Sequence, residues 1–309
     1  MLKYTLRRLL LLIPILLAVT FIVFTLLHLT PGDPAKMILG ERATDEAVAQ
    51  LRADMGLNRP FLVQYVMFVR NLVLKFDIGR SYVTRKLVAL EIMSCFPATI
   101  RLAFSAIFVA IVVGVPIGVI SATKQYSIFD NLAMFLGLVG ISMPVFWLGL
   151  LLIILFSIQI RILPSSGYTT WKHMILPAIT VGAQSIAIVA RMTRSSMLEV
   201  IRQDYIRTIR AKGQKESFII IFHVLRNALI PIITVIGLQF GSLLSGAVMC
   251  ETIFSIPGVG RLMVEAVKSR DYPIVLGGIL FIAIGFSLVN LIIDILYAFI
   301  DPKIRTQYS

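Results

Sequence analysis

Residues 99–122 decide the fold class, and they read TIRLAFSAIFVAIVVGVPIGVISA with one charged residue, Arg101. A helix needs about 20 predominantly apolar residues to cross the hydrocarbon core of a bilayer. This run has that length, and its apolar residues are continuous, whereas a surface helix of a soluble protein carries them on one stripe only. The stretch therefore predicts a transmembrane helix, with Arg101 close enough to the outer end to reach the membrane surface.

Five further apolar runs extend this prediction to the whole chain; they cover residues 9–30, 132–158, 174–191, 229–249 and 274–300. The run at 174–191 is the weakest of the six, because it contains Gln184 and Ser185. The composition agrees, since 58% of the 309 residues are hydrophobic and 15% are charged, whereas soluble domains are about half apolar and about a quarter charged. The sequence predicts an all-α integral membrane protein with six transmembrane helices.

The basic residues predict the orientation of these helices. Lys3, Arg7 and Arg8 precede the first run, and residues 192–228 are also rich in Lys and Arg, which places both segments in the cytoplasm by the positive-inside rule. Six spans then put the C-terminus inside as well. The first run is too long for the apolar region of a signal peptide, so it is expected to remain as an anchor. The expected parts are a cytoplasmic N-terminus with the first helix (1–30), an extracytoplasmic loop (31–98), a five-helix core (99–300) and a cytoplasmic tail (301–309).

The net charge of +13 does not indicate a nucleic-acid-binding protein. Much of the excess lies beside apolar runs, where the positive-inside rule accounts for it. Cys95, Cys250 and three scattered histidines show no metal-ligand spacing, so no metal site is expected. Both cysteines are expected near the outer face. A disulfide between them stays an open alternative to two independent apolar cysteines, which the spacing favours.

The long outer loop is expected to be structured. It opens with Pro31–Pro34, a turn that ends the first helix. Residues 45–54 predict a short polar helix, and residues 60–76 predict an amphipathic one. The apolar side of the second helix is expected to pack on the helix bundle, because Arg70 and Lys75 alone supply positive charge for binding a membrane surface.

The most informative polar segment is 199–231. A helix is predicted over Tyr205–Lys212, because Gly213 suits the position after a helix end. A second helix is predicted to start near Ser217 and to run towards Pro231. A loop that only joined two spans would need far fewer residues. A structured, basic segment of this length indicates that a partner docks there.

This segment resembles the EAA loop of ABC importer permeases, most closely that of the B-type membrane subunit in the dipeptide, oligopeptide and nickel class. The resemblance rests on DYIRTIRAKG at 204–213 and HVLRNALIP at 223–231. Arg207-Thr208-Ile209 stand where the general pattern has Glu-Ala-Ala. Further segments that resemble the family occur in the same order along nearly the whole chain, at 31–34, 76–79, 162–164, 175–177, 190–197, 251–260, 270–273 and 294–302.

The resemblance implies that the loop forms a coupling helix that docks on a separate cytoplasmic ATPase subunit. The chain has no phosphate-binding loop of the Gly-x-x-x-x-Gly-Lys-Ser/Thr type. It is therefore expected to be no enzyme, to have no catalytic residues and to bind no cofactor, with ATP and Mg used by the ATPase subunits. Arg207, Arg210, Lys212 and Lys215 are expected to meet acidic residues of the ATPase, and Ile206 and Ile209 to fill its apolar groove. The whole predicted coupling set is Tyr205, Ile206, Arg207, Thr208, Ile209, Arg210, Ala211, Lys212, Gly213 and Lys215.

The resemblance also implies an assembly in the bacterial inner membrane. The expected partners are a second permease subunit of similar fold, two ATPase subunits, an extracytoplasmic substrate-binding protein and membrane lipid, without nucleic acid. The loops at 31–98 and 250–273 are placed to meet the binding protein. Short peptides are the expected substrate, with glutathione-like peptides and nickel chelates as alternatives.

A cavity-facing patch is expected near the middle of the third run, at Ser142, Met143, Pro144, Phe146 and Trp147. Lipid-facing aromatic residues are an equally good account of the same pattern. Glu251 is expected either near the mouth of the pathway, where it would meet a peptide amine, or as an exposed loop carboxylate. A secondary transporter would need charges deep in several spans and inverted repeats. An intramembrane enzyme would need clustered catalytic side chains on facing spans; the runs show neither feature.

Overall fold

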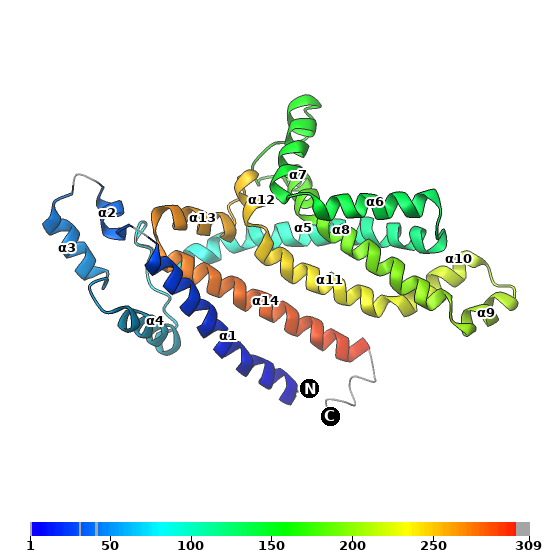
Figure 1. Cartoon of the computed structure of the whole chain (residues 1–309), viewed down its shortest axis with the longest axis horizontal. Helices are drawn as coiled ribbons and strands as arrows, with labels where there is room; N and C mark the ends of the chain where they lie inside the picture. The colour runs from blue at the N-terminus through cyan, green and yellow to red at the C-terminus, as the bar shows by residue number, and fades with distance from the viewer. Residues whose placement is uncertain (1, 31, 41–42, 301–309) are drawn as a thin grey trace. The chain divides into compact units, whose positions relative to one another are not determined.

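A computed structural model describes the backbone of residues 2–30, 32–40 and 43–300, and all of their side chains except those of 2–9, 245–246 and 294–300. The predicted tail at 301–309 and Pro31 lie outside these residues. The described chain is helical, with one isolated bridge between Arg80 and Leu87 (Figure 1). Its helices are α1 (Leu2–Leu29), α2 (Pro34–Leu39), α3 (Asp45–Asp54), α4 (Phe61–Lys75), α5 (Val88–Thr123), α6 (Ile128–Ser142), α7 (Val145–Leu152), η1 (Ile153–Gln159), α8 (Lys172–Ile201), α9 (Asp204–Ala211), α10 (Glu216–Phe218), η2 (Ile219–Leu225), α11 (Arg226–Gly246), α12 (Val248–Ile253), α13 (Val259–Ser269) and α14 (Tyr272–Ile300).

The all-α membrane class is confirmed. Among the described residues, five helices are long and apolar enough to cross a membrane, and a sixth span is counted when the bent pair of α6 and α7–η1 is taken as one. The helices form two compact units. The first unit holds 100–256 together with the end of α14 from Leu288, and the second holds 2–99 and 257–287.

Small residues bring α5 and α8 close together in the first unit. A Cβ atom added to Gly118 of α5 would lie 2.6 Å from the carbonyl oxygen of Ala190, and one added to Gly182 of α8 would lie 3.0 Å from that of Ala106. No larger side chain fits at such distances without a shift of the backbone. Close approach through small residues is how membrane helices gain packing energy without a hydrophobic driving force.

The polar residues that weakened the fourth predicted span have a structural reason. The most hydrophobic window of α8 is 61% buried inside the protein, more than that of the other four helices that meet the length and hydropathy test. Ser185 of α8 donates a hydrogen bond to the side-chain oxygen of Gln239 on α11, at 3.1 Å. A helix that faces protein can therefore carry polar side chains, since a neighbouring helix satisfies them.

The third predicted span, 132–158, is not one straight helix. It divides into α6 and α7, which meet at a 107° bend. Met143 adopts an extended backbone with ψ of 128°, as expected for a residue that precedes a proline. Pro144 then stands before the first residue of α7, where its missing N–H leaves no hydrogen bond unmade. The proline therefore ends one helix and starts another.

Three other helices have boundaries that differ from the predicted ones. Helix α5 begins at Val88, 11 residues before the predicted span, because Val88 and Ile92 are fully buried in an apolar cluster with Val259 and Ile274. Helix α8 continues to Ile201, through the first part of the predicted 192–228 loop. The helix after the loop starts at Glu216 and runs on through Pro231 as α10, η2 and α11.

In the second unit, α4 packs on α1 as the amphipathic pattern predicted. The Tyr65 hydroxyl donates to the carbonyl oxygen of Leu17 at 2.8 Å, and the Tyr65 ring lies 5.1 Å from that of Phe21. The predicted polar helix is α3, whose N-cap residue, Thr44, accepts a hydrogen bond from the Ala47 amide. The extracytoplasmic loop of the prediction therefore consists largely of helices.

Candidate functional site

The helix predicted over Tyr205–Lys212 is present as α9. It begins after Gln203, ends at Ala211 and buries one residue, Ile206. Ile206 is 0% exposed and belongs to an apolar cluster with Met197 of α8 and Val224 of η2. Ile209 is partly buried against the same cluster. Both isoleucines therefore fix α9 to its own protein, and the groove-filling role expected for Ile206 is not available to a side chain that faces inward.

A polar contact also joins α9 to the helix that follows the turn. Tyr205 is 37% exposed, and its hydroxyl accepts a hydrogen bond from the Asn227 side-chain amide at 2.9 Å. The same amide donates to the carbonyl oxygen of His223 at 2.7 Å. These contacts and the Ile206 cluster hold one side of α9 against α8, η2 and α11.

The turn after α9 has the expected glycine geometry. Gly213 has a φ of +75°, and its amide donates to the Arg210 carbonyl oxygen at 2.9 Å. Across the turn, the Arg210 guanidinium donates to both carboxylate oxygens of Glu216, at 3.1 and 2.6 Å. This contact raises the pKa of Arg210. Arg210 therefore closes the turn within the protein.

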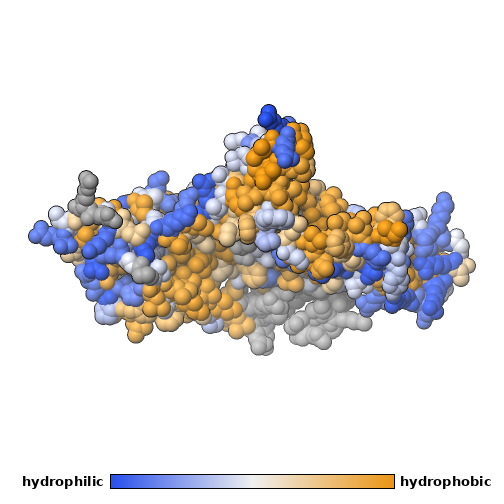
Figure 2. Space-filling model, turned by 45° about the horizontal axis from the view of Figure 1, so that its top comes forward, coloured by the Kyte–Doolittle hydropathy of each residue, from blue (hydrophilic) through white to orange (hydrophobic). Residues whose placement is uncertain are grey.

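The remaining members of the predicted coupling set form an exposed surface on α9 and its turn. Figure 2 shows hydrophilic residues gathered at this end of the first unit. Arg207 lies 3.7 Å from Asp204, an exposed pair of little energetic weight. Lys212 and Lys215 make no salt bridge within the described residues. These remaining members are Arg207, Thr208, Ala211, Lys212, Gly213 and Lys215.

A buried ion pair lies on the same side of the unit and was not predicted. Asp130, at the start of α6, is 2% exposed, and Arg194 of α8 donates two hydrogen bonds to its carboxylate, at 2.7 and 2.8 Å. Ser121 of α5 and the Tyr126 amide, at 2.9 Å, donate to the same carboxylate. The α5–α6 connection is thereby attached to α8, the helix that leads into α9.

The predicted pathway patch is brought together at the α6–α7 bend. All five residues, Ser142, Met143, Pro144, Phe146 and Trp147, line one hollow of about 560 Å³ together with Leu138 and Val139. Phe146 and Trp147 are 48% and 45% exposed. Glu251 does not join them, because it is fully buried in α12. Its burial rules out the exposed loop carboxylate in this conformation, and a position near the mouth of the pathway stays a prediction.

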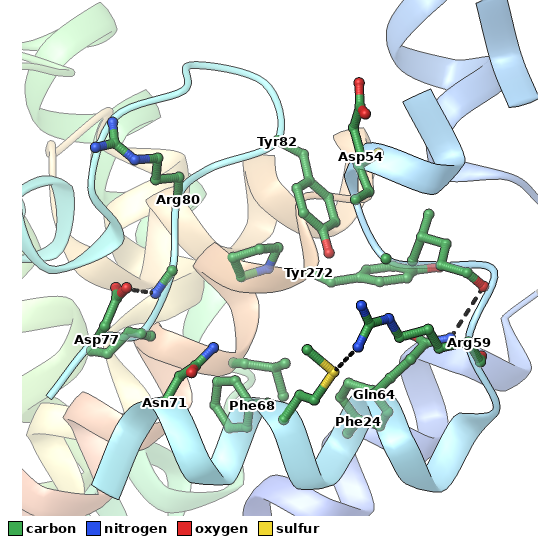
Figure 3. Close-up of a pocket in the computed structure, with 18 of the residues that line it drawn as sticks. Phe24, Asp54, Arg59, Gln64, Phe68, Asn71, Asp77, Arg80, Tyr82 and Tyr272 are labelled. Carbon is green, nitrogen blue, oxygen red and sulfur yellow. Dashed lines mark hydrogen bonds between the residues drawn. The ribbon is translucent and has the colours of Figure 1, made fainter. Parts of the chain in front are cut away.

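The second unit contains a hollow of about 380 Å³ that the sequence did not indicate (Figure 3). Tyr82 and Tyr272 line it, with ring centres 6.4 Å apart. Burial and the nearby Asp271 raise the pKa of Tyr82 from its ordinary value to about 12. The segments at 76–79 and 270–273, two of those that resemble the permease family, both reach this hollow, since Gly79 and Pro273 line it.

The residues that the structure describes contain no group of three or more His, Cys, Asp or Glu side chains that could hold a metal ion. Cys250 is buried, and its thiol lies 3.7 Å from the carbonyl oxygen of Pro177. Both cysteines are present as thiols. The pair of independent apolar cysteines is thus the arrangement found.

Family models match almost the entire sequence. Residues 114–306 match "Binding-protein-dependent transport system inner membrane component", and residues 1–103 match the N-terminal model of the same membrane components. The chain belongs to this family of inner membrane transport components. It is thus a multi-pass protein of the bacterial inner membrane and a permease component of an ABC importer.

Curated relatives align with this chain over 99% of its length. The dipeptide transport system permease protein DppB of Alkalihalophilus pseudofirmus is 47% identical, over 99% of this chain and 100% of the relative. DppB of Escherichia coli K12 is 44% identical, over 99% of both chains. The glutathione transport system permease protein GsiC of Salmonella typhimurium is also 44% identical, over 99% of both chains.

Solved structures share the fold at lower identity. A chain of the MetNI methionine ABC transporter, in inward-facing conformations, matches with a TM-score of 0.56 and 17% identity, over 69% of this permease component and 97% of that chain. A chain of an amino acid ABC transporter matches with a TM-score of 0.51 and 18% identity, over 67% and 94%. At these identities the likeness concerns the fold alone.

Proposed function

We propose that this permease component forms half of the translocation pathway of an importer for short peptides, and that α9 transmits ATP-driven movement to it. The observation that carries the proposal is the construction of α9, a short basic helix exposed on one side and fixed on the other by Ile206 and Tyr205. A helix held in this way moves as a rigid body with α8 and η2, because a close-packed core does not absorb a push by deforming.

The ATPase contact is proposed for the exposed side of α9. Arg207, Lys212 and Lys215 offer positive charge there, and acidic residues on a partner would complement it. Such rim charges govern orientation and the rate of association more than affinity. Ile206 and Ile209 act from the inner side, where they set the angle at which α9 is presented.

The proposed assembly follows the family: a second permease subunit, two ATPase subunits and an extracytoplasmic binding protein. Both termini and α9 lie in the cytoplasm of this arrangement, because Lys3, Arg7, Arg8 and the basic 192–228 segment then share one side. ATP and Mg are used by the ATPase subunits. This chain carries out no catalysis and binds no cofactor of its own.

The hollow at the α6–α7 bend is proposed to face the pathway. A broken helix at membrane depth is tolerated where it is enclosed by protein or lines a cavity. Ser142 adds a hydroxyl beside the ring systems of Phe146 and Trp147 in that hollow. Glu251 joins the proposed pathway only after a movement of α12, because its carboxylate is buried in this conformation.

Short peptides are the proposed substrate, since the near-full-length relatives named above are dipeptide and glutathione permeases. Glutathione-like peptides are the first alternative and nickel chelates the second. The ligand bound by the partner binding protein distinguishes these three. A dipeptide bound to that protein would support the proposal. A chelated nickel ion would show that nickel chelates, and not short peptides, are the substrate.

A proximity experiment tests the coupling role in the assembled importer. Cys95 and Cys250 are first replaced by serine, and single cysteines are then placed at positions 207–214 or at 123–131. We expect crosslinks to the ATPase from exposed positions such as 207, 208 and 212, and fewer from 123–131. Position 206 is an internal control, since its side chain faces the core. If no position in 207–214 crosslinks, the coupling assignment fails.

A further inference from the structure

We propose that a hollow between α5 and α8 in the first unit binds an anionic phospholipid, with its phosphate at Arg101 and one acyl chain along the two helices. The hollow measures about 810 Å³. It shares no lining residue with the hollow at the Pro144 bend or with α9. Three observations carry the proposal: the polar end, the apolar wall and their order along the helices.

The polar end holds a cation that the protein does not neutralise. Arg101 lines the hollow, and its guanidinium carbon lies 5.0 Å from the centre of the Tyr168 ring. The described part of the chain places no carboxylate within ion-pair distance of Arg101. A guanidinium close to hydrocarbon favours an anionic partner, because it is costly to leave its charge unpaired there. Phosphate matches its planar donors.

The apolar wall is supplied by residues one helical turn apart. Phe104 and Phe108 of α5 are 58% and 66% exposed and line the hollow with Met174 and Ala178 of α8. Residues four apart lie above one another on a helix, so each helix contributes a continuous strip. The two strips run side by side, because α5 and α8 touch at Ala106 and Gly182.

The order of these groups matches the order of groups in a lipid. Arg101 and Trp171 lie at the same end, close to the start of α8, and the phenylalanines and Met174 follow along the helices. Trp171 is 72% exposed, and tryptophan at the end of a span is typical of the membrane interface. The hollow thus passes from interface to hydrocarbon as a phospholipid does.

The chemistry of the lining selects the headgroup. No carboxylate is found among the described residues that line the hollow, so a headgroup amine has no acidic partner there. Phosphatidylglycerol, which carries a phosphate and no amine, therefore fits better than a zwitterionic lipid. The competing occupant is the surface of a second permease subunit, which offers an apolar contact but no phosphate for Arg101.

The test uses the complete importer in nanodiscs of phosphatidylcholine that contain phosphatidylglycerol with a photoreactive group on one acyl chain. After irradiation, we expect label on residues 104–109 and 174–178. Unlabelled phosphatidylglycerol should suppress it, and phosphatidylcholine should not. Arg101→Gln should reduce the label about fivefold, the effect of one basic residue near a membrane surface. Arg161→Gln, which removes an exposed charge outside the hollow, should leave it unchanged.

A second variant fills the hollow without removing the charge. Ser105 lines it, and its hydroxyl donates a hydrogen bond within its own helix, to the Arg101 carbonyl oxygen. Ser105→Phe should abolish the acyl-chain label while the importer still elutes as an intact complex. Equal labelling of the Arg101→Gln and Arg161→Gln variants would overturn the proposal. So would efficient crosslinking of Phe108→Cys to the second permease subunit, because the hollow would then be a subunit interface.

Discussion

The carboxylate of Asp130 and the guanidinium of Arg194 form a two-point ion pair, at 2.7 and 2.8 Å, between residues 64 positions apart in the chain. Arg194 lies two turns before the end of α8, and α9 follows that end after Arg202 and Gln203. The pair therefore ties the α5–α6 connection to the same rigid segment that carries α9. If α8 and α9 move as one body, as proposed above, this contact would carry the start of α6 with them.

We predict that Asp130→Asn destabilises the protein by up to about 3 kcal/mol, since it leaves a partly buried Arg194 without its counter-charge. Asp204→Asn, at an exposed carboxylate paired with Arg207, should change stability by less than about 0.5 kcal/mol. Thermal unfolding of the detergent-solubilised protein measures both. A charge-reversed double variant should not recover stability, because Ser121 and the Tyr126 amide would then donate towards an arginine.

A second prediction concerns Asp271 in the other unit. Its carboxylate, 3% exposed, accepts hydrogen bonds from Ser81 and from the Tyr82 amide, the latter at 3.0 Å. Asp271→Asn should cost about 1–3 kcal/mol and speed hydrogen exchange of the amides at 81–83. Asp54→Asn, at an exposed residue of the same unit, is the control. Unchanged exchange at Tyr82 would show that the loop is held by other contacts.

A third prediction tests the orientation. Reporter fusions at the N-terminus and after Ser309 should both report a cytoplasmic location, whereas an insertion at Gly56, between α3 and α4, should report the opposite side. Gly56 is suitable because it lies in the turn between α3 and α4, where an added Cβ would have no neighbour within 4 Å. A C-terminus on the outer side would require an odd number of spans. The bent pair at α6 and α7 would then not cross the membrane.

The helices themselves were predictable from sequence, because a span must satisfy its backbone within a long apolar segment. The turn at Gly213 was equally readable, since few other residues adopt its φ. The bend at Pro144 was not, because proline inside an apolar run is compatible with a modest kink or with a complete break, and the choice depends on packing. The Asp130–Arg194 pair has no local signal, since only the fold brings the two residues together.

Within the candidate site, the sequence likewise did not determine which side of α9 faces the protein core. The sequence placed Ile206 and Ile209 in the right helix but could not say which way they face, because an apolar side chain on a docking helix suits either its own core or a partner. Their burial distinguishes packing in the protein's own core from contact with a partner. Ile206→Ala should cost about 2–4 kcal/mol through the cavity it leaves, and thermal unfolding should show this, while Ile221→Ala, at a 55% exposed residue, should cost far less.

Lys212→Glu should act in the opposite way to Ile206→Ala. It reverses a charge on the exposed side of α9, so stability should stay within about 0.5 kcal/mol of the wild type. Association with the ATPase should weaken, and more so at low salt, where charge repulsion is least screened. Co-purification of the ATPase at two salt concentrations measures this. Normal association at low salt would remove Lys212 from the docking surface.

The last prediction tests whether the turn at Gly213 sets the angle at which α9 is presented to the ATPase. An added Cβ at Gly213 meets nothing within 4 Å, so a substitution there is opposed by its φ of +75° and not by crowding. Gly213→Val should therefore strain the turn by about 1–2 kcal/mol. Gly213→Asn should be tolerated far better, because asparagine adopts this conformation most readily after glycine.

Both Gly213 variants should insert and assemble with the second permease subunit, because the site lies outside every apolar cluster described above. The valine variant should lose most ATP-driven uptake, since strain in the turn changes the angle of α9 against the ATPase. The asparagine variant should retain uptake, which is measured per assembled complex in proteoliposomes. If valine and asparagine variants transport equally well, the turn does not set the angle of α9, and the Ile206 cluster and Tyr205 alone determine it.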